Sequence, residues 1–271
     1  MFGVTKRSSI GEARALKRAV QAARLPPLET AQLGEKLTAF LERDLLDSHG
    51  RAVLLTAANR PVKLGSVKWG VYAFYDYDDK PIYVGQTRES LRTRIRRHLT
   101  NQRTDAVAMS VLDPFEVRKV RVWPLPELQG VKKADGAAWR EGLKRLSAVE
   151  RRIYDEIGVL DGQVMILNEK DPPNVELAGV MPASYEGEIV SEAVLVLRGH
   201  SDARIARRAA TLAKLAQVVS ERELRTTGLR RALLVQAQRI ATLAVRRFEE
   251  TGGQSFVATA DASKAEDQGD V

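Results

Sequence analysis

The chain has 271 residues, of which 44% are hydrophobic and 29% charged, with a formal net charge of +8. This composition is typical of a globular protein of one or two domains, and the positive charge favours a polyanionic partner such as nucleic acid, although it also serves solubility. The absence of cysteine and the presence of only three histidines exclude disulfides, thiolate zinc sites and histidine-rich metal clusters, so any metal must be held mainly by oxygen.

No segment has the pattern of a membrane span or a secretory leader. No apolar run approaches the roughly 20 residues that a span requires. Residues 1–20 contain no apolar stretch followed by a small-residue cleavage site. We therefore expect a cytoplasmic protein with no membrane partner.

Residues 1–65 are expected to form a helical N-terminal region. Apolar residues recur at three-to-four spacing over 10–23 and over 30–47, with a break at Pro26 and Pro27. This region shows no candidate chemistry.

From Val67 the sequence becomes rich in β-branched and aromatic residues. VKWGVYAFY and KPIYVG are predicted to be two strands joined by a turn at 76–79, which makes a β-hairpin. The order of elements predicts an α+β fold with a small mixed sheet flanked by helices, in a domain over 66–175. The further elements expected in it are a basic helix over 89–101, a strand within 114–125 and a helix over 137–156.

A Pro- and Gly-containing connector, residues 176–200, is expected to lead into a basic helical hairpin over 201–250 and a disordered tail over 251–271. Residues 198–250 hold twelve Arg and Lys against five Asp and Glu, whereas the tail holds one Lys against four acids. The hairpin could grip the nucleic-acid backbone. It could also form a homodimer through an apolar stripe made of Ile205, Ala209, Leu212, Ala216 and Val219.

Two patterns of glycine and tyrosine stand out in the central domain. Tyr72 in Gly-Val-Tyr and Tyr83 in Tyr-Val-Gly are separated by ten residues, 73–82. Alone, such a pair is typical of cross-strand packing. On the following helix, however, Arg94 and His98 lie four residues apart, on a face next to the apolar stripe.

Glu150 interrupts an apolar helix stripe. Residues Leu143, Leu146, Ile153 and Ile157 follow three-to-four spacing around it. A buried carboxylate without a partner is costly, so we expect either a metal ion or a salt bridge, for instance to Arg94.

Over about 66–175 these features resemble the GIY-YIG nuclease superfamily, with valine in place of both isoleucines of the name. The resemblance implies a GIY-YIG-like fold. It also implies catalytic roles for six residues, the last of which is the asparagine of MILNEK. These residues are Tyr72, Tyr83, Arg94, His98, Glu150 and Asn168.

The resemblance further implies cleavage with one divalent ion, Mg²⁺ or Mn²⁺, held by Glu150. Tyr72 would act as the base, with its pKa lowered by cations such as Arg94. Tyr83 and His98 would orient the water or relay its proton. Arg94 would bind the scissile phosphate, and Asn168 would either anchor the site or serve as a simple cap.

The leading hypothesis is thus a metal-dependent endonuclease acting on double-stranded DNA, of the restriction or defence kind. For Arg92, Arg96 and Arg97, contact with the phosphate backbone or simple solvation is expected rather than catalysis. The alternative is a protein that keeps the fold and binds nucleic acid without cleaving it.

Overall fold

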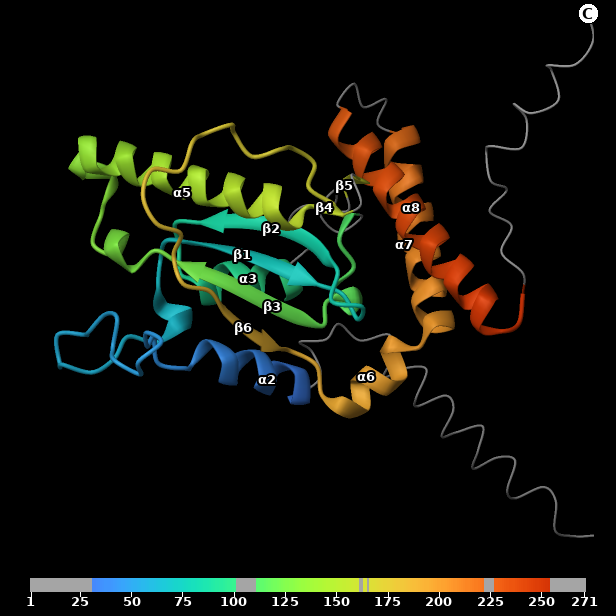
Figure 1. The fold of residues 1–271 in the computed structure, drawn as a ribbon, viewed down its shortest axis with the longest axis horizontal. Coiled ribbons are helices and arrows are strands. Elements are labelled where there is room, and N and C mark those ends of the chain that lie inside the picture. Colours follow the sequence, from blue (N-terminus) through green and yellow to red (C-terminus); the bar gives the residue numbers. More distant parts are fainter. Residues whose placement is uncertain (1–30, 101–110, 161–162, 165, 222–226, 254–271) are drawn as a thin grey trace, which may run out of the picture.

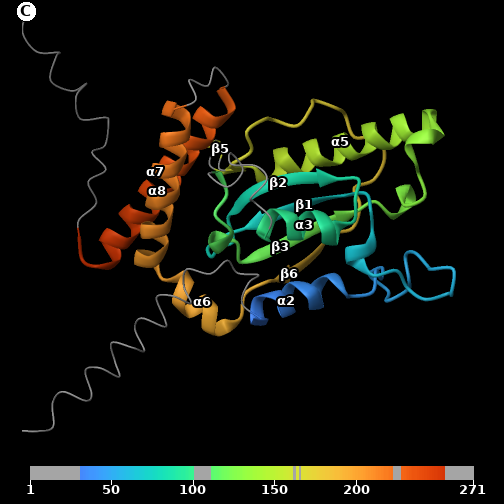
Figure 2. The same cartoon turned by 180° about the vertical axis from the view of Figure 1, so that it is seen from behind.

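The computed structural model describes residues 31–100, 111–160, 163–164, 166–221 and 227–253. They form an α+β fold in which a four-stranded sheet carries helices on both faces (Figures 1 and 2), and the predicted fold class is confirmed. The helices are α2 (Ala31–Leu41), α3 (Leu91–Thr100), α5 (Ala137–Ile157), α6 (Glu192–Gly199), α7 (Ser201–Glu221) and α8 (Thr227–Glu250). The strands are β1 (Gly70–Tyr75), β2 (Pro81–Thr87), β3 (Lys119–Pro124), β4 (Val159–Leu160), β5 (Gln163–Val164) and β6 (Tyr185–Glu188). The predicted helix over 10–23 and residues 254–271 of the predicted tail lie outside the described residues.

The sheet has the order β2-β1-β3-β6, and every pairing in it is antiparallel rather than mixed. β1 and β2 form the predicted hairpin, in which Tyr72 lies opposite Gly85. The Asp76 carboxylate accepts hydrogen bonds from the backbone N–H groups of Asp78 and Lys80 at 2.9 and 3.0 Å, which fixes the turn. Because β2 stands at one end of the strand order, next to β1, it is an edge strand of the sheet.

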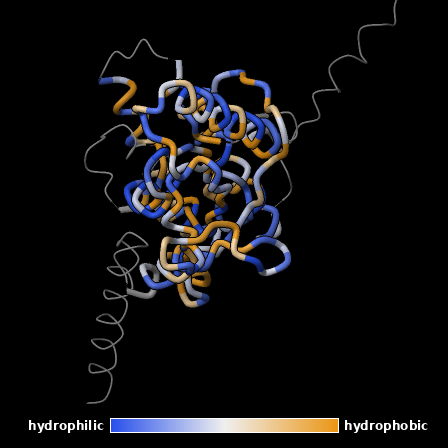
Figure 3. Tube along the Cα trace, turned by 90° about the vertical axis from the view of Figure 1, so that its left-hand side faces the viewer, coloured by the Kyte–Doolittle hydropathy of each residue, from blue (hydrophilic) through white to orange (hydrophobic). Residues whose placement is uncertain are grey.

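Alternation along β1 divides the core into two layers. Tyr72 and Phe74 face α2 and α3, whereas Val71 and Ala73 face α5. Burying an apolar side chain of this size stabilises the fold by roughly 1.5 to 3 kcal/mol. Hydrophobic segments accordingly gather in the middle of the molecule in Figure 3. In the described part of the chain, no helix is both long and apolar enough to cross a membrane.

The free edge of β2 is covered by the segment after β5. The Leu167 N–H donates to the Ile82 carbonyl at 2.7 Å, and the Asn168 side chain bonds to the backbone of Val84. Backbone groups at a sheet edge need such partners when they are buried. These hydrogen bonds place Asn168 beside β2, the strand that contains Tyr83.

Residues 176–200, predicted as a connector, contain β6 and α6. β6 pairs with β3 and adds a fourth strand to the sheet, and α2 packs over it. A Cβ on Gly187 would lie 2.4 Å from the Phe40 ring, so the strand passes directly beneath that side chain. The sequence Tyr-Glu-Gly-Glu has too few apolar residues for a strand to be predicted from its pattern.

α7 and α8 lie side by side against the β1–β2 turn (Figure 1). Their contact with the turn is ionic and buried. Arg208 and Arg239 donate to one oxygen of Asp76 at 2.9 and 2.6 Å, and Arg208 also reaches Glu116 at 2.9 Å. The side chains of Asp76, Arg208 and Arg239 are 1%, 6% and 3% exposed. Arginines whose charge favours a polyanionic partner in the sequence thus bind Asp76 and hold the α7–α8 hairpin against the central domain.

The buried face of α7 therefore differs from the predicted apolar stripe. It consists of Arg204, Arg208, Thr211, Leu215 and Val219. Of the predicted stripe, Val219 is buried, whereas Ala209 and Ala216 are exposed. A hydrophobic pattern cannot reveal a helix face that is buried through ion pairs. The predicted homodimer stays a prediction.

Replacing Asp76 by alanine should lower the free energy of unfolding by about 3 to 5 kcal/mol, because three buried guanidinium groups, those of Arg204, Arg208 and Arg239, lose a shared partner. Urea unfolding followed by circular dichroism measures this loss. Asp155→Ala is the control, since Asp155 is 48% exposed and, among the described residues, pairs with Arg151 on its own helix, an interaction that contributes under about 1 kcal/mol. Equal losses for the two variants would contradict a structural role for the buried cluster.

Candidate active site

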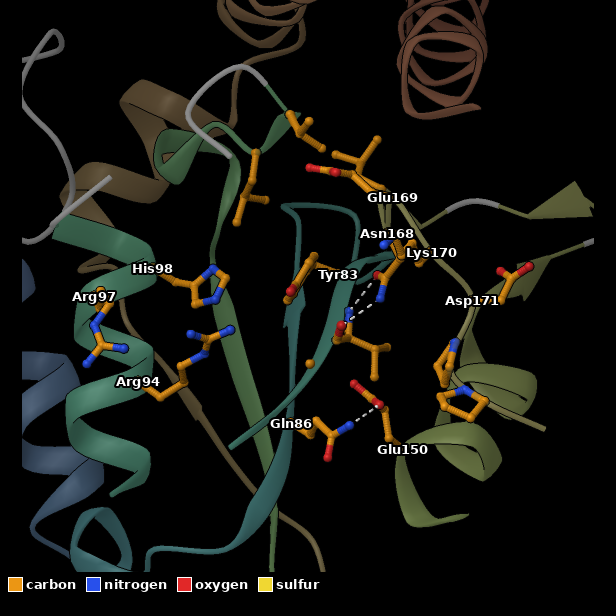
Figure 4. A pocket seen from close by; sticks show the side chains of 17 residues that line it. Tyr83, Gln86, Arg94, Arg97, His98, Glu150, Asn168, Glu169, Lys170 and Asp171 are labelled. Atoms are coloured by element: carbon orange, nitrogen blue, oxygen red, sulfur yellow. Dashed lines mark hydrogen bonds between the residues drawn. The ribbon is translucent and has the colours of Figure 1, made fainter. Parts of the chain in front are cut away.

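A pocket of about 710 Å³ opens at the β2 edge of the sheet. Its walls are β2, α3, the middle of α5 and the segment from Leu167 to Pro173. Figure 4 shows Arg94 and His98 on one side of Tyr83 and Glu150 and Asn168 on the other. Five of the six residues predicted for catalysis line this pocket, and the sixth, Tyr72, lies directly behind it.

Tyr72 is fully buried, at 0% exposure. The Arg94 Nε–H donates to its hydroxyl oxygen at 3.1 Å. A Cβ on Gly85 would lie 2.6 Å from the same oxygen, so only glycine lets the phenol approach the β2 backbone. Burial raises the pKa of Tyr72 well above its ordinary value, and Arg94 acts in the opposite direction without compensating. The expected net lowering of this pKa is not found.

Tyr83 and His98 pack together beside Tyr72. The ring centroids of Tyr83 and His98 are 5.2 Å apart, and those of Tyr72 and His98 are 5.6 Å apart. Burial, followed by the charges of Arg94 and Arg97, lowers the pKa of His98 to about 4. Burial also raises the pKa of Tyr83. At neutral pH the site therefore holds a neutral imidazole and two neutral phenols.

The other arginines of α3 already have partners within the protein. Arg92 pairs with Glu42 at 2.6 Å. Arg97 holds both carboxylate oxygens of Glu89, at 2.5 and 2.6 Å. Arg96 donates to Thr38 Oγ1 at 2.7 Å. The contacts predicted between these three arginines and the phosphate backbone stay predictions. For Arg92 and Arg97, such contacts would compete with the ion pairs to Glu42 and Glu89.

Arg94 differs from Arg92 and Arg97, because it forms no ion pair with any described carboxylate. Its Nε is engaged by Tyr72, and the guanidinium lines the pocket. The planar terminal N–H groups are suited to two oxygens of a phosphate.

Glu150 enters the site from α5, on the opposite face of the sheet from α3. It is 8% exposed, and its Oε2 accepts a hydrogen bond from Gln86 Nε2 at 2.9 Å. No ion pair joins Glu150 to Arg94 in the described structure, so the salt-bridge alternative is not observed. Burial raises the pKa of Glu150 to about 7, against the lowering effects of Gln86 and Arg94.

Gln86 is a site residue that the sequence reasoning missed. It lies two residues beyond Val84 on β2 and therefore faces α5, as Val84 does. The available signal was this alternation, combined with the prediction that Glu150 needs a partner. An uncharged amide satisfies the carboxylate without neutralising it.

The Asn168 side chain is held by the backbone of Val84. Its Oδ1 accepts from the Val84 N–H at 3.1 Å, and its Nδ2 donates to the Val84 carbonyl at 2.7 Å. Both ends of the amide are thus occupied. The residue is buried and is suited to anchoring the pocket wall rather than to binding a ligand.

Glu150 offers one carboxylate to a cation, and no group of three or more His, Asp or Glu in the described residues forms a metal cluster. This donor set fits a hard divalent ion such as Mg²⁺, which commonly keeps several water ligands and takes one or two from carboxylates. A raised pKa also fits, because a cation would relieve the cost of a buried negative charge.

Residues 68–141 match the family model of the GIY-YIG catalytic domain. No curated protein and no solved structure matches the chain. The match includes Tyr72, Tyr83, Arg94 and His98 but ends before Glu150 and Asn168. The fold brings these last two residues to the matched segment.

Glu150→Gln should stabilise the metal-free protein at pH 8 more than at pH 5. The folded-state pKa of about 7 lies above the ordinary value of 4.5, so the folded state binds the proton more tightly. The stabilisation from protonated Glu150 is complete below pH 4.5 and is lost as the pH rises through about 7. Glutamine keeps the bond to Gln86 and does not ionise.

Thermal unfolding in EDTA between pH 5 and 8 measures this effect, which we expect to grow to the order of 1 to 3 kcal/mol. Glu141→Gln, at an exposed position on α5, is the control and should follow the wild-type pH profile. A difference in stability between Glu150→Gln and wild type that is the same at pH 5 and at pH 8 would contradict the burial argument.

Proposed function

Because residues 68–141 match the family model of the GIY-YIG catalytic domain, we propose that this protein is a metal-dependent endonuclease that hydrolyses phosphodiester bonds of double-stranded DNA. The observation that carries the proposal is the meeting of Tyr72, Arg94 and Glu150 around one pocket, from three different elements. A phosphodiesterase needs a base, a cation for the phosphate and a ligand for a metal ion, and these three residues supply them.

Glu150 would hold Mg²⁺ or Mn²⁺, and Gln86 would orient its carboxylate through the 2.9 Å hydrogen bond. A bound divalent ion supplies positive charge that stabilises a phosphate oxygen and the departing oxygen and lowers the pKa of nearby acids. Arg94 would bind the scissile phosphate from the opposite side of Tyr83. The hydrogen bonds between the Asn168 side chain and Val84 would hold the pocket wall in a fixed position against β2.

Tyr72 would remove the proton from the attacking water. In the free protein it is a neutral phenol, since burial outweighs the effect of Arg94. Proton removal by Tyr72 therefore requires more positive charge near its hydroxyl than Arg94 provides alone. Tyr83 and the neutral His98, whose rings flank Tyr72, would orient the water or relay its proton.

The proposal is tested by incubating the protein with supercoiled plasmid in Mg²⁺, Mn²⁺ or EDTA. We expect nicked and linear products with either metal and none in EDTA. Glu150→Gln should slow cutting by about 100-fold or more, because the metal ligand is removed. Glu141→Ala, which removes an exposed carboxylate from the same helix, should cut normally.

If no duplex is cut while wild type and Glu150→Gln bind DNA equally well, the protein is a binding module with a nuclease fold. Discrete fragments from the wild type would support sequence-specific cutting of the restriction or defence kind. Arg94→Lys gives a further comparison, because lysine keeps the charge but loses the planar pair of donors.

The DNA strand is proposed to follow the flank of α5 that leads away from Glu150. Arg88, Arg140 and Lys144 are exposed and have no carboxylate partner in the described structure. Helical geometry places Arg140 and Lys144 on the order of 15 and 9 Å along the axis from Glu150. They share the flank of Arg151, which reaches the Pro172 carbonyl at the pocket rim. Phosphates next to the scissile bond could contact them.

Alanine at Arg88, Arg140 or Lys144 should weaken DNA binding and reduce the slope of log K against log salt by about 1 for each phosphate that is no longer neutralised. The cutting rate at saturating DNA should change little, because these side chains lie outside the pocket. Arg60→Ala, in the exposed loop after α2, is the control. Filter binding at several salt concentrations gives the slopes, and an unchanged slope in all three variants would remove this flank as the DNA path.

A further inference from the structure

α8 lies outside the segment that matches the catalytic-domain family, yet it contacts the wall of the active-site pocket. Arg231 on α8 donates to the Asn168 carbonyl oxygen through Nη2 and to Asp171 Oδ1 through Nη1, both at 2.6 Å. The Tyr154 hydroxyl of α5 donates to the same Asp171 oxygen. Arg231 thus ties the pocket segment to α8 at two points and, through Asp171, to the helix that carries Glu150.

A second contact lies one turn earlier on α8. A Cβ on Gly228 would lie 2.2 Å from the Glu169 carbonyl oxygen, so the first turn of α8 packs directly on the backbone of this wall. A larger residue there would push the two segments apart. The start of α8 therefore sets the position of residues 168–171 by packing as well as by hydrogen bonds.

The middle of α8 is also fixed. Arg239, two turns farther along the helix, donates to Asp76 Oδ2 at 2.6 Å and to the Pro81 carbonyl at 3.0 Å. Both acceptors belong to the β1–β2 hairpin, and Pro81 begins β2. α8 therefore spans the distance between the turn of the catalytic hairpin and the segment that carries Asn168.

We propose that Arg231 is a positioning residue for cleavage: it holds the Asn168 segment so that Asn168 grips Val84 and the pocket wall stays aligned with Glu150. The C-terminal hairpin is then a built-in part of the active site, and its arginines orient the protein's own loop. This role rests on the proposed nuclease function. Its structural consequence at Val84 can be measured without any activity.

Two substitutions test the proposal against a matched control. Arg231→Ala removes both hydrogen bonds, whereas Arg231→Lys keeps the charge and can retain one. Arg230→Ala removes the adjacent arginine of the same helix, which is exposed and has no partner in the described structure. Gly228→Ala disturbs the wall from the other contact and, because alanine favours helix, does not weaken α8 itself.

Hydrogen exchange at the Val84 amide, followed by NMR, reports whether Asn168 keeps its grip, because that N–H donates to Asn168 Oδ1. We expect faster exchange in Arg231→Ala and Gly228→Ala, partial protection in Arg231→Lys and wild-type protection in Arg230→Ala. In the plasmid assay, Arg231→Ala should reduce kcat by about 10- to 100-fold with KM nearly unchanged, since misplacement by about 1 Å has effects of this size. Lysine should restore part of the rate.

Unchanged Val84 exchange in Arg231→Ala would overturn the proposal, as would an equal effect in Arg230→Ala. A fall in kcat that lysine does not relieve at all, with Val84 protection intact, would also overturn it. If the wild type cuts no nucleic acid, the proposed function fails, and the exchange comparison still decides whether Arg231 positions Asn168.

Discussion

The candidate site depends on β2 being an edge strand. A strand presents side chains to two faces and backbone groups to its edge, and β2 uses all three directions within four residues. Tyr83 and Gly85 face α3, where Tyr72 and Arg94 meet. Gln86 faces α5 and holds Glu150. The N–H and carbonyl of Val84 point outward from the edge of the sheet and bond to the Asn168 side chain. An interior strand also has two faces, but its backbone groups are bonded to strands on both sides and could not bind the Asn168 side chain.

Local sequence patterns were sufficient to predict the helices and strands that surround β2. The hairpin follows from its β-branched and aromatic residues, and the positions of Arg94 and Glu150 follow from helical periodicity. The meeting of α3 and α5 at one pocket came from the family resemblance, because no pattern within a single helix specifies which sheet edge it reaches. Gln86 was missed for a related reason, since its only signal is alternation on a short strand. β6 was missed because its exposed glutamates hide the strand pattern.

The buried ionic cluster was also beyond the reach of the sequence. Arg208 and Arg239 meet Asp76 across 132 and 163 residues of chain, and nothing local marks them as partners. The net charge of the C-terminal helices predicts a surface for polyanions, yet several of these arginines are neutralised by the β1–β2 turn and by Glu116. Composition gives the charges that a chain contains, whereas only the fold determines which of them remain at the surface.

Electrostatics within the site links its two acidic groups. Burial raises the pKa of both Tyr72 and Glu150, and a negative charge on Glu150 raises that of Tyr72 further. In the free protein the two groups therefore oppose each other's ionisation, and Arg94, though it favours both charged forms, does not overcome burial. Added positive charge beside Glu150 would favour both ionised forms together, so carboxylate and phenolate are expected to appear as a coupled pair. Under the proposed mechanism, such coupling would keep Tyr72 neutral until a cation binds beside Glu150, because burial makes the ionisation of both groups depend on nearby positive charge.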